Sequence, residues 1–314
     1  MSIPFLHRGA VLLAQGGRRA VEQVYGLADD TTGRPCSART RFQIASISKN
    51  MAAAAVLLLA ERGRLDVHDP VDRWVPNCPP AWRPITLHHL LTHTSGLGHW
   101  EEYPLLDLAG AVDPDELLAR FHAVPPLFAP GAGWHYSSPG YVVLARAVER
   151  AADRAYRDFL AEEVFAPLGM TGSFAGSGAG RPDVATGHSG GRPVRSWDLD
   201  TVGMGAGDVW CTADDLLAWL DGLRDARLLT PASVARMIAA YAQAQVGSGP
   251  QAYGYGCFVG PLAGERSVNH SGHNLGFKAF VAWLPDSDRR LVVLTNDDED
   301  PGAPTLIDHL LATN

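Results

Sequence analysis

Lysine is almost absent from this sequence. Of the 26 Lys and Arg residues in the 314-residue chain, only Lys49 and Lys278 are lysine. Arginine therefore serves wherever a permanent positive charge is sufficient. A lysine differs from arginine because, when desolvated, it can lose its proton near pH 7 and act as a base. The lysine at position 49, three residues after Ser46 in the stretch FQIASISKN, therefore suggests a chemical role.

The chain also lacks an excess of positive charge and any long apolar run. Its net charge of -8 and pI near 5.8 argue against nucleic acid or an anionic membrane as a partner. The longest apolar run, Met51 to Ala60, has ten residues, which is about half of what a membrane span needs. The N-terminus lacks the pattern of a signal peptide, so we expect a cytoplasmic location unless a leader has been trimmed.

Cysteine is scarce and widely spaced. The four cysteines have no metal-ligand spacing, and we expect them to be free thiols. They are Cys36, Cys78, Cys211 and Cys257.

Strand patterns occupy both ends of the chain, and helix patterns occupy its middle. Short apolar runs bounded by turn residues predict strands over 9–15, 18–28, 253–260, 267–273, 277–285 and 289–297. Longer segments with helix-start signals predict helices over 48–63, 85–93, 114–124, 139–169, 211–226 and 304–314.

The predicted fold class is α/β (α+β), with an antiparallel sheet built from both chain ends, flanked by helices, and an inserted all-helical region. Residues 1–60 and 205–314 are expected to form the sheet domain and 61–204 the helical domain. An active site is expected at the seam between them.

Ser46 and Lys49 are spaced to share one face of a helix. The segment behind them, Met51 to Ala60, is apolar on every side, which is typical of a buried helix. Burial lowers the pKa of a lysine, and a neutral amine can take the proton of a serine hydroxyl. Ser48 is a rival hydroxyl, but it is adjacent to Lys49 and points to another face. The spacing alone also fits an ordinary capped helix with a solvated lysine.

The Ser46–Lys49 segment and four further stretches decide between a catalytic pair and an ordinary capped helix. In chain order they read FQIASISK, ITLHHLLTHTSGL, FAPGAGWHYSSPGYVVLARAVE, GAGDVWCTADDLLAWL and VNHSGHNLGFKA, and the resemblance that they carry extends roughly from Arg8 to the C-terminus. Together they resemble the serine β-lactamase and penicillin-binding-protein superfamily, in its class C, esterase and D-aminopeptidase-like branch. The resemblance implies the β-lactamase-like fold and an acyl-enzyme mechanism without metal or cofactor.

The resemblance also implies roles for individual residues. Ser46 would be the nucleophile and Lys49 its base partner, while Tyr136 would be a second acid/base group that protonates the leaving group. The backbone N–H groups of Ser46 and His273 would form the oxyanion hole, where each donor is typically worth about 3–4 kcal/mol of transition-state stabilisation.

Two substrate-binding positions depart from the family pattern. Ser138 stands where an Asn is usual, and it is too short to offer a side-chain amide. His270, Ser271 and Gly272 occupy the strand triplet that is Lys-Thr-Gly in many members. A histidine is mostly neutral at pH 7 and holds a substrate carboxylate poorly. We therefore expect β-lactamase activity to be weak at most.

The sequence thus predicts a serine hydrolase that acts on a small ester or amide, with an esterase-like or D-aminopeptidase/amidase-like activity. One alternative is an acyltransferase that uses the same acyl-enzyme. Another, of a different class, is an acyl-accepting or ligand-sensing domain that does not turn over. The expected partner is the small-molecule substrate, with no nucleic acid and no membrane, and the oligomeric state is left open.

Three weaker patterns have ordinary explanations. Gly187 to Gly191 fits the G-x-S-x-G nucleophile elbow, but its flanks read as loop rather than as strand and helix. The histidines of the ITLHHLLTHTSGLGH stretch lack the glutamate of a zinc motif, because Leu90 stands there. We expect them to fix a turn by hydrogen bonds; they are His88, His89, His93 and His99.

The acidic run 296–301 is expected to be a solvated loop rather than a calcium site. Several aromatic residues fall in loops near the presumed cleft and are expected to pack in the core or a lid, with a wall for an apolar acyl group as the alternative. These aromatic residues are Trp82, Trp100, Tyr103 and Trp134.

Overall fold

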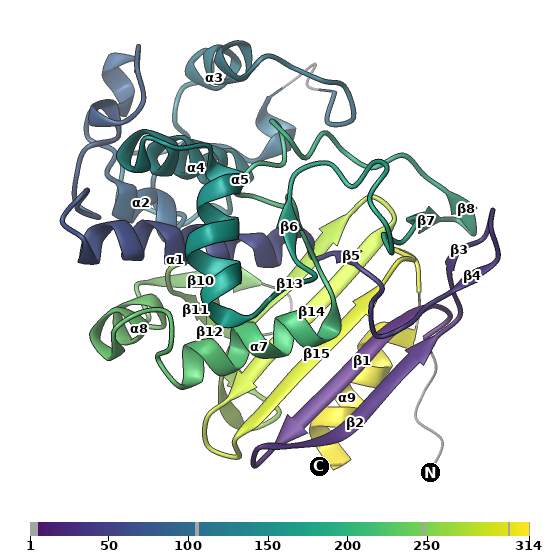
Figure 1. Cartoon of the computed structure of the whole chain (residues 1–314). Helices are drawn as coiled ribbons and strands as arrows, with labels where there is room; N and C mark the ends of the chain where they lie inside the picture. Colours follow the sequence, from purple (N-terminus) through teal and green to yellow (C-terminus); the bar gives the residue numbers. More distant parts are fainter. Residues whose placement is uncertain (1–5, 104–106, 247–248, 301, 314) are drawn as a thin grey trace.

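One large antiparallel sheet organises the fold (Figure 1). A computed structural model of the chain describes residues 6–103, 107–246, 249–300 and 302–313. In spatial order the strands are β10 (Ala242–Val246), β11 (Gly249–Tyr253), β12 (Phe258–Leu262), β13 (Glu265–Asn274), β14 (Phe277–Leu284), β15 (Arg289–Thr295), β1 (Gly9–Gln15) and β2 (Arg18–Tyr25).

The two ends of the chain meet inside this sheet. β1 lies between β15 and β2 and pairs antiparallel with both, with Val11 opposite Val293. The predicted sheet from both chain ends is therefore confirmed. The run GAVLLAQ forms an interior strand, next to the edge strand β2, because its apolar residues are buried on both faces of the sheet.

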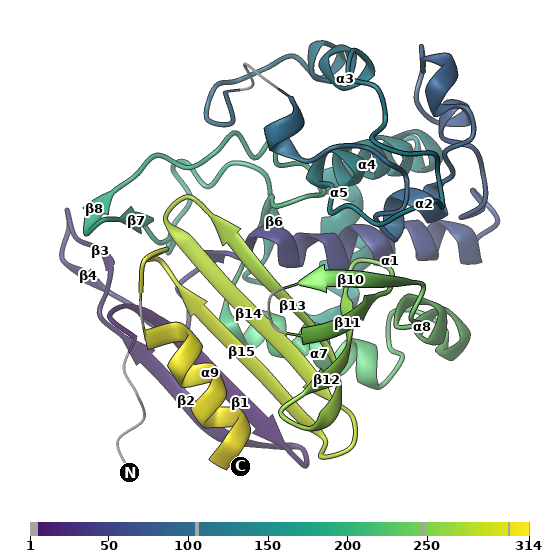
Figure 2. The same cartoon turned by 180° about the vertical axis from the view of Figure 1, so that it is seen from behind.

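Helices cover both faces of the sheet. On one face α9 (Gly302–Thr313) packs leucines such as Leu306 and Leu310 against Val11 and Leu13 of β1 (Figure 2). On the other face α7 (Ala213–Arg224) lies along β1 and β15. Thr212 caps α7 by accepting the N–H of Asp215, so the helix predicted over 211–226 begins at Ala213.

The helix α1 (Ser48–Glu61) joins the sheet to the helical part of the molecule (Figure 1). Every residue from Ser48 to Leu59 is buried, as the apolar pattern predicts. The helix α4 (Ser138–Ala152) packs along it on the side away from the sheet. Residues at the start of α1 therefore lie where sheet and helices meet.

The remaining elements are short. The other helices are α2 (Leu87–Leu91), α3 (Pro114–His122), α5 (Tyr156–Leu160), α6 (Ala166–Leu168) and α8 (Pro231–Met237), with a 3-10 turn η1 (Ala45–Ile47) before α1 and a π-helical turn η5 (Ala161–Phe165) before α6. The short strands are β3 (Leu27–Asp29), β4 (Arg34–Pro35), β5 (Phe42–Gln43), β6 (Phe174–Ala175), β7 (His188–Ser189), β8 (Arg192–Pro193) and β9 (Val209–Cys211).

Some predicted boundaries are wrong. The predicted strand 253–260 is interrupted by a turn over 254–257 between β11 and β12, where Gly256 adopts a φ of +75°, and its end, 258–260, is extended as part of β12. The predicted helical segment 139–169 breaks at Asp153, which has a φ of 53°. The inserted region also holds the short strands β6, β7 and β8, which the sequence patterns did not reveal. The division into 1–60 with 205–314 and 61–204 remains a prediction.

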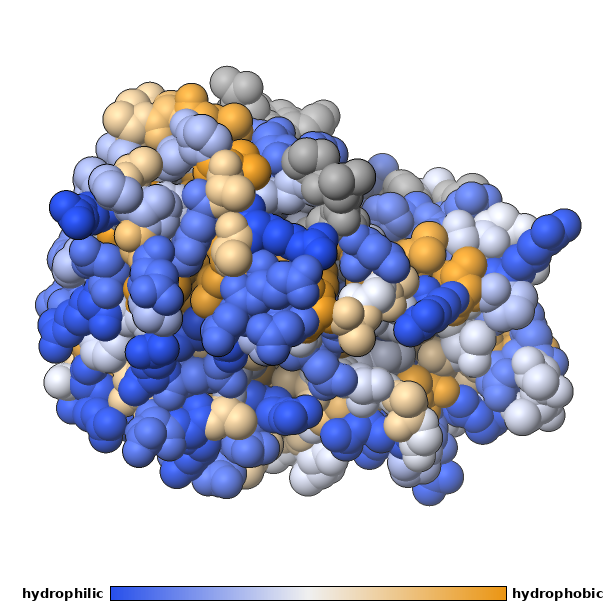
Figure 3. All heavy atoms as spheres, turned by 90° about the horizontal axis from the view of Figure 1, so that it is seen from above, coloured by the Kyte–Doolittle hydropathy of each residue, from blue (hydrophilic) through white to orange (hydrophobic). Residues whose placement is uncertain are grey.

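All four cysteines are free, as expected. None of the helices in the described part of the chain combines the length and apolar character that a bilayer crossing requires. On the face seen in Figure 3, hydrophilic residues predominate and hydrophobic ones gather in small separate groups.

Candidate active site

Ser46 lies in the 3-10 turn η1, just before α1 rather than within it. The preceding residue, Ala45, is fully buried and has a φ of 48°, a left-handed conformation that costs energy for a residue with a Cβ. This sharp turn leads from β5 into α1 and leaves the Ser46 side chain half-buried, at the wall of a cavity.

Lys49 is completely buried beside Ser46. Its Nζ lies 2.9 Å from Ser46 Oγ and 2.8 Å from the carbonyl oxygen of Ala206. Burial lowers the pKa of Lys49 well below its usual 10.5, and the nearby Asp208 carboxylate opposes this shift. A neutral amine in this position can donate one N–H to Ala206 and accept the hydroxyl proton of Ser46.

Tyr136 completes this group. Its ring lies 5.0 Å from Lys49 Nζ, and its hydroxyl is hydrogen-bonded to the Ser46 side chain. Burial raises the pKa of the phenol far above its usual value, so the hydroxyl keeps its proton at neutral pH. The structure therefore brings together the three residues for which the sequence suggested acid/base and nucleophilic roles.

Two histidines hold the Tyr136 segment in place. His93 Nδ1 accepts the N–H of Ser137, and His99 Nδ1 accepts the N–H of Ser138, each at 3.1 Å. The prediction that these histidines form structural hydrogen bonds is correct, but the prediction that they fix their own turn is wrong for His93 and His99, because their partners lie in another segment. Within the described ranges, no group of three or more His, Cys, Asp or Glu side chains is arranged to hold a metal ion.

His270 is a buried residue in the wall of the active-site cavity, and both of its ring nitrogens have partners. Its Nδ1 lies 2.6 Å from the Ser271 carbonyl oxygen, so this nitrogen carries the hydrogen, and Nε2 then accepts the hydroxyl of Tyr253 at 3.0 Å. Burial, helped by the nearby Lys49 charge, lowers the pKa of His270 to about 3. His270 is therefore neutral at physiological pH.

A cavity of about 670 Å³ opens over these residues. Its lining residues are Ser46, His99, Trp100, Glu101, Leu108, Tyr136, Trp197, Phe258, His270, Ser271 and His273. A smaller cavity of about 50 Å³ continues from it and is lined by Ser138 and Asn274 among others. The predicted residues thus converge on one place, with Ser138 at its smaller end.

Gly272 allows the strand β13 to pass very close to the turn of Ser46. A Cβ at position 272 would lie 2.1 Å from the carbonyl oxygen of Ile44 and 3.1 Å from the Ala45 side chain. Only glycine fits this approach, which places the backbone of β13 alongside that of η1. The oxyanion hole formed by the N–H groups of Ser46 and His273 remains a prediction.

Sequence reasoning missed several residues of the site. Trp197 lines both cavities from a loop, and Asp208 lies close enough to Lys49 to influence its charge. Asn274 Nδ2 donates to Gln43 Oε1 at 2.8 Å and to the Gly207 carbonyl at 3.0 Å, which ties β13 to the two segments beside it. Asp208 and Asn274 lie inside the quoted stretches GAGDVWCTADDLLAWL and VNHSGHNLGFKA, and this position was the sequence signal that could have revealed them.

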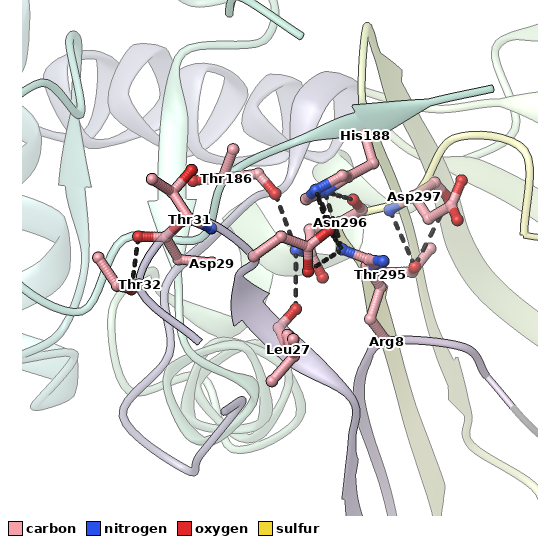
Figure 4. A network of polar contacts seen from close by, with 11 residues as sticks. Arg8, Leu27, Asp29, Thr31, Thr32, Thr186, His188, Thr295, Asn296 and Asp297 are labelled. Carbon is pink, nitrogen blue, oxygen red and sulfur yellow. Dashed lines mark hydrogen bonds and ion pairs between the residues drawn. The ribbon is translucent and has the colours of Figure 1, made fainter. Parts of the chain in front are cut away.

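The rival serines have other roles or surroundings. The Oγ of Ser48 accepts the N–H of Val209 at 3.0 Å and is completely buried, away from the cavity. Ser189 lies in the two-residue strand β7, which is not the strand-to-helix turn that a nucleophile elbow needs. Its neighbour His188 is buried in a polar network with Arg8 and the backbone of Asn296 (Figure 4).

The prediction of a solvated acidic loop is wrong for most of the described part of the run, 296–300, in which only Glu299 is exposed; Pro301 lies outside the described residues. Asp297, Asp298 and Asp300 are buried, and each accepts a backbone N–H that the chain must satisfy. Asp298 holds the N–H of Gly276 at 2.7 Å and lies 3.8 Å from the His273 ring, so this loop supports the end of β13.

The predicted aromatic residues divide between core and cavity. Trp82 and Tyr103 are buried in the core, and Trp134 packs against Tyr253. Trp100 instead forms part of the cavity wall.

A family model described as Beta-lactamase matches residues 6–313. The chain therefore belongs to the Beta-lactamase family, within the serine β-lactamase and penicillin-binding-protein-like superfamily, as the sequence motifs predict.

Similar proteins within this superfamily have different names. The chain is 29% identical over 320 residues to penicillin-binding protein 4* of Bacillus subtilis (strain 168), covering 93% of this chain and 68% of the relative. It is 40% identical over 183 residues to esterase EstB of Burkholderia gladioli, covering 52% of this chain and 45% of the relative. It is 28% identical over 314 residues to a D-aminopeptidase of Cereibacter sphaeroides, covering 95% of this chain and 58% of the relative.

A solved structure shows the same fold. The octameric penicillin-binding protein homologue from Pyrococcus abyssi superimposes with a TM-score of 0.87 at 24% identity, covering 98% of this chain and 73% of that one. This likeness confirms the predicted β-lactamase-like architecture.

Proposed function

We propose that this protein is a serine hydrolase that forms an acyl-enzyme on Ser46 and acts on a small ester or amide, as an esterase or a D-aminopeptidase-like amidase. The observation that carries the proposal is the fully buried Lys49 amine, 2.9 Å from the Ser46 hydroxyl at the wall of a 670 Å³ cavity. Membership of the Beta-lactamase family supports it, as do the esterase and D-aminopeptidase among the relatives.

The reaction begins when a substrate carbonyl carbon enters the cavity beside Ser46. The neutral Lys49 amine takes the hydroxyl proton as Ser46 Oγ attacks that carbon. The N–H groups of Ser46 and His273 stabilise the oxyanion. The Tyr136 hydroxyl, hydrogen-bonded to Ser46, donates a proton to the departing alcohol or amine and recovers one from Lys49.

The walls of the cavity disfavour substrates that carry a carboxylate. His270 is neutral, and both of its nitrogens already have partners, so it offers no cation to a substrate carboxylate. Trp100, Trp197 and Phe258 present aromatic surface for an apolar group. We therefore expect short-chain esters and small amides without a carboxylate to be turned over much faster than a cephalosporin.

The test is a substrate panel combined with protein mass. The purified protein is incubated with p-nitrophenyl acetate and butyrate, D-amino acid amides and a chromogenic cephalosporin, and both product and intact protein mass are followed. Many product equivalents per chain are expected with an ester or amide, and Ser46→Ala should abolish them. Ser189→Ala is the matched control, because it changes the other motif serine and should leave turnover unchanged.

The same experiment separates the alternatives. If the protein gains one acyl adduct per chain and releases no further product, it is an acyl acceptor that does not turn over, and the hydrolase proposal is wrong. If an alcohol is added to the reaction and its ester with the acyl group is formed, the protein is an acyltransferase. Unchanged turnover in Ser46→Ala would move the nucleophile elsewhere and refute the proposal.

A further inference from the structure

A second cavity lies behind the catalytic lysine, between α3, α4, α5 and the segment 199–208. It has a volume of about 270 Å³ and shares no lining residue with the cavity over Ser46. The side chain of Asp208 reaches it from the segment whose Ala206 carbonyl holds Lys49. The cavity is therefore a separate place in the fold with a direct electrostatic connection to the active site.

Two buried polar atoms in this cavity have no partner within the described chain. Asp208 and Tyr156 are each only 1% exposed. Asp208 Oδ1 and the Tyr156 hydroxyl are buried without a hydrogen bond, although both residues line the cavity. A buried carboxylate oxygen without a partner is costly, so its persistence suggests that something binds there.

The other residues that line this cavity are apolar in its interior, and at its mouth each arginine is paired with a carboxylate. Leu117, Leu118 and Val142 form apolar walls. At the mouth Arg146 is paired with Glu149, and Arg157 with Asp200. Asp208 therefore supplies the single unbalanced charge of the lining, and that charge is negative when the group is ionised.

We propose that this cavity is a second ligand site that binds a small primary amine as its ammonium ion, with the charged head on Asp208 and the apolar stem against Leu117, Leu118 and Val142. An ammonium group has three donors, of which one satisfies Asp208 Oδ1 and another satisfies the Tyr156 hydroxyl oxygen. A hard metal ion fits less well, because one carboxylate and one phenol offer too few ligands. An anion is excluded by the charge of Asp208.

The properties of Asp208 agree with this assignment. Burial raises the pKa of Asp208 to about 7, and the backbone N–H groups of Gly205 and of Asp208 itself, with the nearby Lys49 charge, compensate its negative charge only in part. A bound ammonium ion would supply the rest of that compensation. The site should therefore be tested at pH 8, where the carboxyl group is mainly ionised even when the cavity holds no ligand.

The test is isothermal titration calorimetry of the full chain at pH 8 with n-butylammonium chloride, and with n-butanol as the neutral probe of similar shape. We expect one amine to bind per chain with a Kd in about the millimolar range. Because butanol lacks the charge that pairs with Asp208, its binding should be roughly ten- to a hundredfold weaker.

Two variants locate the binding. Asp208→Asn should weaken amine binding by roughly ten- to a hundredfold. Ala155→Trp places a large side chain at the exposed mouth of the cavity and should abolish binding without touching Asp208. Ala161→Trp is the matched control, because it makes the same change at an exposed alanine outside the lining, and it should bind as the unaltered protein does.

The proposal is overturned if no saturable amine binding occurs, which would leave the cavity as a water site. It is equally overturned if the amine still binds to Ala155→Trp, which would assign the amine to another place such as the Ser46 cavity. If Asp208→Asn fails to fold, the pair Ala155→Trp and Ala161→Trp decides the question alone. Calorimetry does not depend on turnover, so failure here leaves the proposed hydrolase activity standing.

Discussion

At the scale of single residues, the rarity of lysine pointed to the right amine. The sequence predicted that Lys49 would be buried within reach of Ser46, and the structure places its Nζ 2.9 Å from that hydroxyl. It did not predict that Asp208 would act on the same amine, because that proximity arises only when the segment before β9 folds against α1. The burial of Lys49 was predictable from the apolar run that follows it, whereas the charge of Asp208 near its amine was not.

Lys49→Arg should abolish most of the activity. Arginine keeps the positive charge but cannot release its proton, so the base is lost, and general-base catalysis typically contributes about 10²–10⁴-fold in rate. The check is kcat/KM for a short-chain p-nitrophenyl ester. Lys278→Arg, the same change at the only other lysine, should keep full activity. Equal activity of the two variants would contradict the role of Lys49.

Asp208→Asn should move the acid limb of the pH–rate profile to lower pH. The negative charge of Asp208 favours the ammonium form of Lys49 and raises its pKa, so removing that charge lowers the pKa further. In Asp208→Asn the Lys49 amine therefore loses its proton, and becomes an active base, at a lower pH. The check is kcat/KM measured from pH 5 to pH 9 on both proteins, and a limb that stays in place or moves upward would show that Asp208 does not act on Lys49.

At the scale of elements, long apolar segments were predictable and short connections were not. The strands β1, β14 and β15 and the helices α1, α3 and α7 follow the predicted segments closely, because their burial patterns are continuous. The strand β10 and the helix α8 were missed, and their short, mixed sequences carry little periodic signal. The close contact between β13 and η1 at Gly272 could not be predicted from the sequence either, although it positions the backbone beside Ser46.

Gly272→Ala should disturb the active site more than the fold. The added methyl group would lie 2.1 Å from the Ile44 carbonyl, so β13 and η1 must separate and misalign Ser46. We expect kcat/KM for the ester to fall by about 10²-fold or more, while far-UV circular dichroism stays close to that of the unaltered protein. Gly133→Ala, where the new methyl meets neighbours only at an ordinary 3.4 Å, is the control and should be active. Full activity of Gly272→Ala would show that this close approach is unimportant.

At the scale of the whole molecule, sheet and helices share one hydrophobic core. The same cluster contains Leu12 and Val292 of the sheet, Leu57 of α1 and Val143 of α4. The sequence indicated a helical region inserted between two parts of a sheet, but it could not show that α1 would be buried by both. The shared core follows from the fully apolar surface of α1, which needs partners on every side.

This shared core predicts a single unfolding transition. In urea, tryptophan fluorescence and far-UV circular dichroism should change with the same midpoint, since neither part can lose α1 and remain folded. Leu57→Ala, which empties a buried position of α1, should lower the free energy of unfolding by about 2–5 kcal/mol and shift both probes equally. Two separate midpoints would show that the sheet and the helices unfold independently.

The central claim is that the Lys49 amine is uncharged when it meets the Ser46 hydroxyl, and the two-lysine composition makes this directly measurable. Protein labelled with ¹³C at lysine Cε gives one NMR signal from each lysine, and Lys278→Arg leaves only that of Lys49. A pH titration of that signal reports the charge of the amine. We predict that Lys49 titrates well below the usual pKa of 10.5. An amine that stays protonated up to that pH would contradict the proposed mechanism.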